Sequence, residues 1–322
     1  MTQSVYRTKA LQDPLKPLAR KKYATAFADA KVFHIFVWIK NCHIRIEKEI
    51  IMNDIVQILS FDKYIAPLEH TSDGRMAATH LASVKWIDNK AGRFYVKVYP
   101  KCHSRGLINE ITGYLVAHAT GIPQPKKVAV IQIPKEVIEN NFKGDFECSG
   151  DYYWGWASEE SGTTPNTYLK MGDMATYSQC IEILKKWKSF PIMLAFDDWV
   201  ANQDRNTGNI TIKGYNDFYV IDHGNVPVSE KWTKENLIVE NVYTNKLLDG
   251  LYQNNYPLPL SASLVESSKH HPEAFKKAHQ ELIKWCDALL DEDCSSHLQH
   301  FLEARANLSV SRIKNKTGLL VA

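Results

Sequence analysis

The clearest pattern of apolar and polar positions in the chain lies between Ile192 and Asn225. Its first third predicts a helix, because one face at helical spacing is apolar: Ile192, Phe196, Trp199 and Val200. A loop rich in Asp, Asn and Gly follows. Two short apolar runs, Ile210–Ile212 and Phe218–Ile221, are then joined by a Gly-Tyr-Asn-Asp sequence. These two runs and their turn predict a β-hairpin.

Shorter apolar runs upstream predict a small sheet, with candidate strands Val56–Leu59, Ala78–Trp86, Arg93–Tyr99 and Lys127–Ile133. In the third of these, apolar residues alternate with polar ones, so Lys97 lies on one face between two tyrosines. The polar stretch His70–Arg75 separates the first two strands. Because it holds one glycine, it is either a phosphate-binding loop or an ordinary surface turn.

A helix is predicted after these strands, because Leu107, Ile111 and Leu115 recur every four residues. Glu110 lies in its first turns, 13 residues after Lys97 (110 − 97). A helix packed behind the sheet would aim Glu110 at Lys97, which would hold the ammonium group toward bound phosphates. The alternative is an exposed helix carboxylate beside an exposed strand lysine.

An aromatic cluster at Asp151–Ser158 has two interpretations. It is either the connection between two lobes, where an adenine ring would stack, or a packed hairpin. Downstream, the chain becomes mainly helical, with long amphipathic runs at Pro272–Leu290 and Cys294–Leu308.

Three oxygen-bearing side chains are expected around one point. The residue before the first strand of a hairpin lies beside the residue after the second, so Asn209 and Asp222 should be neighbours. Asp204 lies in the loop that leads to Asn209. Two carboxylates and an amide oxygen suit a hard cation such as Mg²⁺. Taken singly, each of these residues is more typical of turn chemistry than of a metal ligand. Together, Asp-x4-Asn followed by a later Asp has the spacing of a kinase catalytic loop and its metal ligand.

Composition narrows the class of protein without changing this interpretation. The chain of 322 residues is long enough for two lobes or domains, and its 44% hydrophobic and 23% charged residues are typical of a globular protein. The net charge of +3 argues against a broad nucleic-acid-binding surface. Six cysteines occur without a CxxC pair, and no apolar run is long enough to cross a bilayer, so a cytoplasmic protein is expected.

The first 51 residues differ from the rest in charge. They carry ten Lys and Arg against four Asp and Glu, whereas the remainder of the chain carries 29 against 32. We interpret residues 1–51 as a basic extension without stable structure, in preference to a binding arm for nucleic acid or membrane. The segment that starts at Met52 resembles the N-terminal sequence of a folded protein.

Four blocks in order resemble the HipA-like kinases, distant relatives of the phosphoinositide 3- and 4-kinases: YVKVYP, INEITGYLVAHATGIPQP, FDDWVANQDRNTGN and YVIDHG. The resemblance covers about Asn53 to Leu260. It implies that Lys97 binds the phosphates of ATP and that Glu110 is its helix partner. It further implies that Asp204 is the catalytic aspartate and that Asn209 and Asp222 bind magnesium. Some members of that family are toxins that phosphorylate proteins on Ser or Thr, which would add an antitoxin-like partner.

The fold expected from these observations is a two-lobed, kinase-like α+β architecture. A β-rich lobe with one long helix would span 52–160, and a mostly helical lobe 161–322. The expected function is ATP-dependent phosphoryl transfer to a protein Ser or Thr hydroxyl. Two alternatives stay open. One is a pseudokinase that serves as a nucleotide-dependent binding module, and the other is a lipid kinase. The nearly uncharged segment His223–Glu230 argues against the second.

Overall fold

The computed structural model describes residues 35–36, 45–46, 54–70, 76–214 and 216–319. The chain divides into two compact units, Met1–Asp54 and Ile55–Ala322. In the first unit, β1 (Ile35–Phe36) pairs with β2 (Arg45–Ile46) in an antiparallel ladder. The rest of the predicted basic extension lies outside the described residues. So does most of the candidate phosphate loop, because residues 71–75 are not described.

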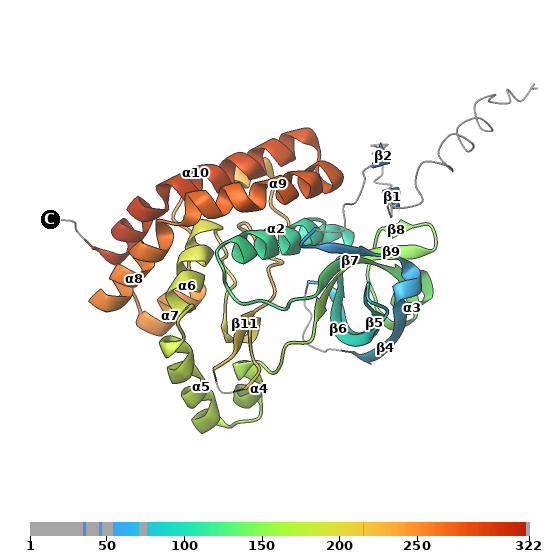
Figure 1. Cartoon of the computed structure of the whole chain (residues 1–322), viewed down its shortest axis with the longest axis horizontal. Helices are drawn as coiled ribbons and strands as arrows, with labels where there is room; N and C mark the ends of the chain where they lie inside the picture. Colours follow the sequence, from blue (N-terminus) through green and yellow to red (C-terminus); the bar gives the residue numbers. More distant parts are fainter. Residues whose placement is uncertain (1–34, 37–44, 47–53, 71–75, 215, 320–322) are drawn as a thin grey trace, which may run out of the picture. The chain divides into compact units, whose positions relative to one another are not determined.

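The second unit begins with a seven-stranded sheet of order β3-β7-β9-β6-β5-β4, with β8 paired to β9 (Figure 1). Its strands are β3 (Gln57–Leu59), β4 (Tyr64–His70), β5 (Ala78–Lys85), β6 (Ala91–Val98), β7 (Val128–Pro134), β8 (Cys148–Ser149) and β9 (Tyr152–Glu159). All neighbours are antiparallel except β3 and β7. The predicted alternation in β6 is confirmed, because Phe94, Val96 and Val98 are buried in the core of the sheet lobe.

The aromatic cluster at residues 151–158 is a sheet strand and does not connect the lobes. β9 pairs with β7 on one side and β6 on the other, and β8 and β9 form a hairpin. The connection to the helical part comes after it and includes Gly162, whose φ is +116°. The neighbouring residue Thr163 exchanges two backbone hydrogen bonds with Ile212, at 2.8 and 3.3 Å. A Cβ at residue 162 would lie 2.3 Å from the Ile212 carbonyl oxygen, so this close approach requires glycine.

Helix α2 (Gly106–Ala119) is buried almost all round, which a single apolar face did not predict. It packs on α9 and contacts β9, so it lies between the sheet and the helical part (Figure 1). Gly113 is required at one of its contacts. A Cβ there would lie 2.3 Å from the Cβ of His223.

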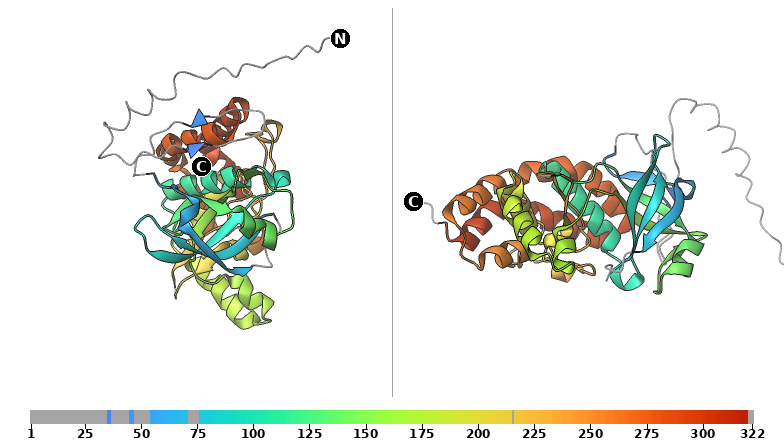
Figure 2. Two further views of the ribbon diagram at one scale, coloured as in Figure 1. Left: turned by 90° about the vertical axis from the view of Figure 1, so that its right-hand side faces the viewer. Right: turned by 90° about the horizontal axis from the view of Figure 1, so that it is seen from below.

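The helical part follows, and Figure 2 shows it at the opposite end of the second unit from the sheet. Its elements are α4 (Pro165–Lys170), α5 (Met174–Lys186), α6 (Phe190–Trp199), β10 (Ile210–Ile212), β11 (Phe218–Val220), α7 (Lys246–Tyr252), α8 (Leu258–Ser268), α9 (His271–Leu289) and α10 (Glu292–Thr317). Short helices fill the connections, namely α3 (Lys135–Asn141) and the 3-10 turns Phe61–Lys63, Lys101–His103, Thr207–Asn209 and Lys234–Asn236.

Helix α6 is the centre of the helical core. Its carbonyls at Asp198 and Trp199 accept hydrogen bonds of 2.6 and 2.8 Å from the fully buried guanidinium of Arg305 on α10. These bonds satisfy carbonyl groups that a helix end leaves unpaired. The order of sheet, α2 and helical lobe confirms the expected two-lobed α+β architecture. In the described part of the chain, no helix has the length and apolarity to span a membrane.

Candidate functional site

Lys97 lies at the centre of the candidate site. Its Nζ is 2.6 Å from Oε1 of Glu110 on α2 and 2.8 Å from Oδ1 of Asp222, which follows β11. The lysine side chain is 15% exposed. Burial lowers the pKa of Lys97, but the two carboxylates outweigh burial and leave its pKa raised. The structure therefore holds a charged ammonium group between the two lobes, and the predicted pairing of Lys97 with Glu110 is present.

Glu110 is a buried carboxylate with a partner for each oxygen. Oε1 accepts from Tyr99 at 2.9 Å as well as from Lys97, and Oε2 accepts from the backbone N–H of His223 at 2.8 Å. Burial and the nearby carboxylates raise the pKa of Tyr99, so its phenol stays a donor. Glu110 thus ties the strand that carries Lys97 to the segment after the hairpin.

The hairpin forms at the expected residues. Ile210 pairs with Val220, and the Ile221 N–H donates to the Asn209 carbonyl at 3.1 Å. This places Asn209 and Asp222 at the same end of the hairpin, as the sequence predicts. Asp222 has a φ of +60°, a left-handed conformation that directs the chain away after β11. Burial raises the pKa of Asp222, but Lys97 outweighs burial and leaves its pKa lowered, so the side chain is a carboxylate.

The loop before the hairpin is ordered by its own amides. Asn202 Oδ1 accepts from the Asp204 N–H at 3.1 Å, and Asn206 donates to the Asp204 carbonyl and accepts from the Gly208 N–H. The turn chemistry considered for this loop therefore applies to Asn202 and Asn206. The Asp204 carboxylate has different partners. Lys246 Nζ lies 2.8 Å from Oδ1, and Asn225 donates to Oδ2 at 3.4 Å.

Arg205 is a residue of the site that the sequence patterns did not indicate. Its guanidinium is fully buried and pairs with Asp197 of α6 at 3.1 Å. Nη1 donates to the carbonyls of Asn209 at 3.2 Å and Ile221 at 2.6 Å. Arg205 therefore supports both candidate metal ligands through the backbone beside them. The signal in the sequence was the pair Asp197 and Asp198, because two carboxylates on a helix that is otherwise mainly apolar require buried partners.

His223 completes this network. Nδ1 lies 3.3 Å from Arg205 Nη2, and Nε2 lies 2.9 Å from Gln124 Oε1. Burial, together with the charges of Arg205 and Lys97, holds the pKa of His223 well below its usual range. The imidazole is therefore neutral. It accepts from Arg205 and donates to Gln124, which assigns the proton to Nε2.

We expect the stability of the protein to fall as the pH decreases below about 6.5. His223 is neutral when buried, and burial also lowers the pKa of His271 to about 3. The unfolded chain protonates both near pH 6.5. Because it then binds more protons than the folded chain, His271 should cost about 2 kcal/mol between pH 7 and pH 5, and His223 should add to this loss. The measurement is the free energy of unfolding in denaturant across this pH range.

The variant His271→Phe removes one of these groups and keeps a ring against Trp199, which the histidine stacks on at 4.6 Å. Its stability should depend less steeply on pH than that of the wild type. His300→Gln, at an exposed position, should leave the slope unchanged. Equal slopes in wild type and His271→Phe would contradict this account.

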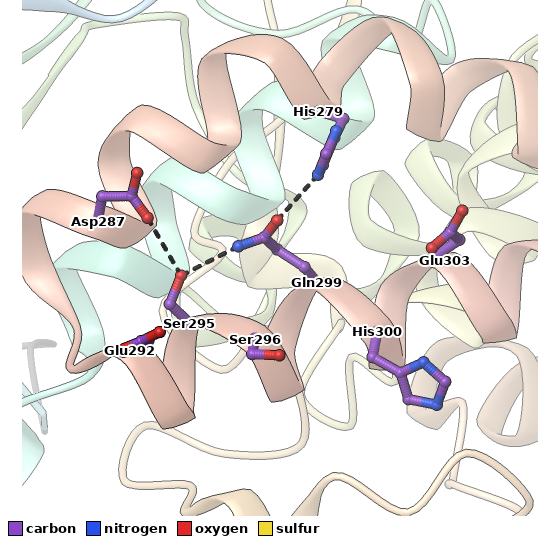
Figure 3. A pocket seen from close by; sticks show the side chains of 8 residues that line it. All are labelled: His279, Asp287, Glu292, Ser295, Ser296, Gln299, His300 and Glu303. Carbon is purple, nitrogen blue, oxygen red and sulfur yellow. Dashed lines mark hydrogen bonds between the residues drawn. The ribbon is translucent and has the colours of Figure 1, made fainter.

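A pocket between α9 and α10 shares no residue with this site (Figure 3). Four of its polar side chains are joined by hydrogen bonds. His279 pairs with Gln299 at 2.9 Å, Gln299 donates to Ser295 at 3.0 Å, and Ser295 lies 3.5 Å from Asp287. Among the described residues, no three His, Cys, Asp or Glu side chains cluster as a metal site, in this pocket or elsewhere.

Comparison with known proteins relates the chain to one family model and to solved structures. The family model described as HipA-like kinase matches residues 87–289. A solved structure titled as the crystal structure of the Golgi casein kinase shares 12% identity, covering 80% of this chain and 74% of its own, with a TM-score of 0.39. That similarity is too low to support a functional comparison. A search of the curated proteins gave no match.

Proposed function

Because the chain belongs to the HipA-like kinase family, we propose that it transfers the γ-phosphoryl group of ATP to a hydroxyl group. The observation that carries this proposal is the meeting of Lys97, Glu110 and Asp222 within 2.8 Å, from a strand, a helix and the end of a hairpin. A charged lysine held by a buried helix glutamate is what kinases use to bind nucleotide phosphates. We assign Lys97 to these phosphates and Glu110 to the positioning of Lys97.

Magnesium is the proposed cation, with Asn209 and Asp222 as its protein ligands. Their carboxamide and carboxylate oxygens suit a hard cation, and both lie at the same end of the hairpin. Two protein oxygens leave room for phosphate oxygens and water in an octahedral shell. When bound, the ion neutralises charge on the phosphates. Arg205 holds the backbone at both ligands in place, because it donates hydrogen bonds to the carbonyls of Asn209 and Ile221.

Asp204 is the proposed catalytic carboxylate. It lies in the loop before Asn209 and is 39% exposed, so an acceptor hydroxyl can reach it. Its role would be to orient that hydroxyl and to accept its proton as the new oxygen–phosphorus bond forms.

For the acceptor we propose a protein Ser or Thr hydroxyl. The segment after Asp222 supports a peptide over a lipid headgroup, because it is tied to α2 and presents little charge. Asn109 of α2 donates to the carbonyls of Gly224 at 2.7 Å and Ser229 at 3.0 Å. A membrane-facing segment would instead need exposed basic residues. The proposed location of the reaction is the cytoplasm.

The test is incubation of the full chain with γ-labelled ATP and magnesium, with ATP affinity measured by calorimetry in parallel. We expect label on the protein itself in magnesium and none in EDTA. Asp222→Asn should weaken MgATP binding about tenfold or more, or at least 1.4 kcal/mol. Asn209→Ala should weaken it less, because it removes a neutral ligand. The double variant should lose less than the sum, since both residues act on one ion.

The matched control is Asp217→Asn, the same change at an exposed position of the same hairpin. It should bind MgATP as the wild type does. Unchanged MgATP affinity in Asp222→Asn, or wild-type binding that is indifferent to EDTA, would show that the metal site is elsewhere.

A further inference from the structure

Lys246 is the cation that contacts the candidate catalytic carboxylate, although it belongs to a distant segment. Its Nζ lies 2.8 Å from Asp204 Oδ1, and the two side chains are 53% and 39% exposed. An ion pair this exposed contributes at most about 1 kcal/mol to folding. Stability therefore gives little reason for a lysine at this point.

The backbone under Lys246 is nevertheless firmly held. Lys246 is the first residue of α7, and the N-cap residue before it, Asn245, is 1% exposed. Asn245 Nδ2 donates to the Leu194 carbonyl of α6 at 2.8 Å, and its Oδ1 accepts from the Leu248 N–H at 3.2 Å. Leu247 and Leu248 are buried in the helical core. Lys246 thus extends from a fixed point to the loop that follows α6.

Phosphoryl transfer requires positive charge beside the transferring group, where the negative charge is spread over three oxygens. The loop from Asp204 to Asn209 contains one basic residue, Arg205. Arg205 is fully buried, and its guanidinium is directed at Asp197, two carbonyls and His223. Lys97 is held at the other end of the site by Glu110 and Asp222. The Lys246 ammonium group is solvent-exposed and lies beside Asp204, the proposed catalytic carboxylate.

We propose that Lys246 is a catalytic residue that donates hydrogen bonds to the γ-phosphoryl oxygens during transfer; this rests on the proposed kinase function. The acceptor oxygen forms a bond to phosphorus, and the bond from phosphorus to the β–γ bridging oxygen breaks. That oxygen keeps the electron pair and leaves with ADP, and the acceptor proton goes to Asp204. Lys246 stays protonated throughout and moves from Asp204 Oδ1 toward the phosphoryl oxygens as charge develops there.

The test compares wild type, Lys246→Met, Lys246→Arg and the control Lys269→Met in the full chain. Lys269 is a matched lysine on the helical lobe, 55% exposed and paired with Glu266. The readouts are the rate of ADP formation from MgATP, the calorimetric affinity for MgATP and the pH–rate profile. We expect Lys246→Met to lower kcat about 10²–10³-fold, as does removal of one donor to a developing oxyanion. Its affinity for MgATP should stay within threefold of wild type, about 0.7 kcal/mol.

Lys246→Arg should recover part of the rate because it keeps the charge, and Lys269→Met should match wild type. The plateau of the pH–rate profile of Lys246→Met should stay below that of the wild type even if its acid limb moves. A shifted acid limb with a restored plateau would show that Lys246 acts only on Asp204, and would overturn the proposal. So would a kcat within twofold of wild type, or a loss confined to MgATP affinity; both would leave the kinase function standing. No ADP formation by any protein, wild type included, would overturn both proposals.

Discussion

Asp204→Asn is expected to lower the rate of label transfer about 10²–10⁴-fold, the range over which a positioned general base acts. Asparagine has the same shape and can still accept from Lys246 and pair with Asn225, which lie 2.8 and 3.4 Å from the two carboxylate oxygens. It cannot take up the acceptor proton. The loop should stay intact, because the Asp204 backbone is held by Asn202 and Asn206. MgATP affinity should therefore change little.

The measurement is the initial rate of self-labelling at saturating MgATP, with affinity by calorimetry on the same samples. Asp217→Asn again serves as the control for the substitution itself. If Asp204→Asn transfers label within threefold of wild type, Asp204 is not the catalytic carboxylate. If its MgATP binding falls as much as its rate, Asp204 acts on the nucleotide and not on the acceptor.

Arg205→Met is expected to destabilise the protein by about 3–5 kcal/mol, because it leaves the buried Asp197 carboxylate without its cation. Asp197 and Arg205 are both completely buried, 3.1 Å apart. The change also removes the donors to the carbonyls of Asn209 and Ile221. We expect MgATP affinity to fall with stability, since both candidate metal ligands lose their support. Lys cannot replace Arg here, because one ammonium cannot reach partners on three sides.

Unfolding in denaturant measures this loss, and the double variant Arg205→Met/Asp197→Leu tests its cause. Replacing both partners removes the uncompensated charge, so the double variant should be more stable than Arg205→Met alone. Lys185→Met breaks an exposed pair with Glu182 and should cost less than about 1 kcal/mol. A loss below 1 kcal/mol in Arg205→Met, or a double variant less stable than the single one, would contradict this view.

Much of the fold could be read from the sequence because its signals are local. The alternation in β6 and the turn between β10 and β11 depend on neighbouring residues, and both elements formed where predicted. Strand β4 and the central place of β9 were missed, because strand order depends on pairing between distant segments. Their aromatic and irregular sequences gave no clear period.

The same distinction applies to the candidate site. The spacing of Asp204, Asn209 and Asp222 is a local motif, and the hairpin places the last two at one end. The contacts of Arg205, Tyr99 and Lys246 are not local. Arg205 meets Asp197 and the Ile221 carbonyl only after the loop has folded back on α6. Such contacts depend on tertiary packing, which single-sequence patterns do not encode.

The contacts that hold α2 in place limit how the activity of the protein can be regulated. The segment after Asp222 is held by three hydrogen bonds from this helix: Asn109 donates to the carbonyls of Gly224 and Ser229, and Glu110 accepts from the His223 N–H. Gly113 also lies too close to His223 for any side chain to fit between them. Outward rotation of α2 would leave three or four buried polar groups unpaired, at about 1–3 kcal/mol each. Even the smallest of these totals, about 3 kcal/mol, would leave fewer than about one molecule in a hundred with the helix displaced at equilibrium. A regulatory ligand that acts by displacing this helix would therefore find almost no molecules in the displaced conformation to bind.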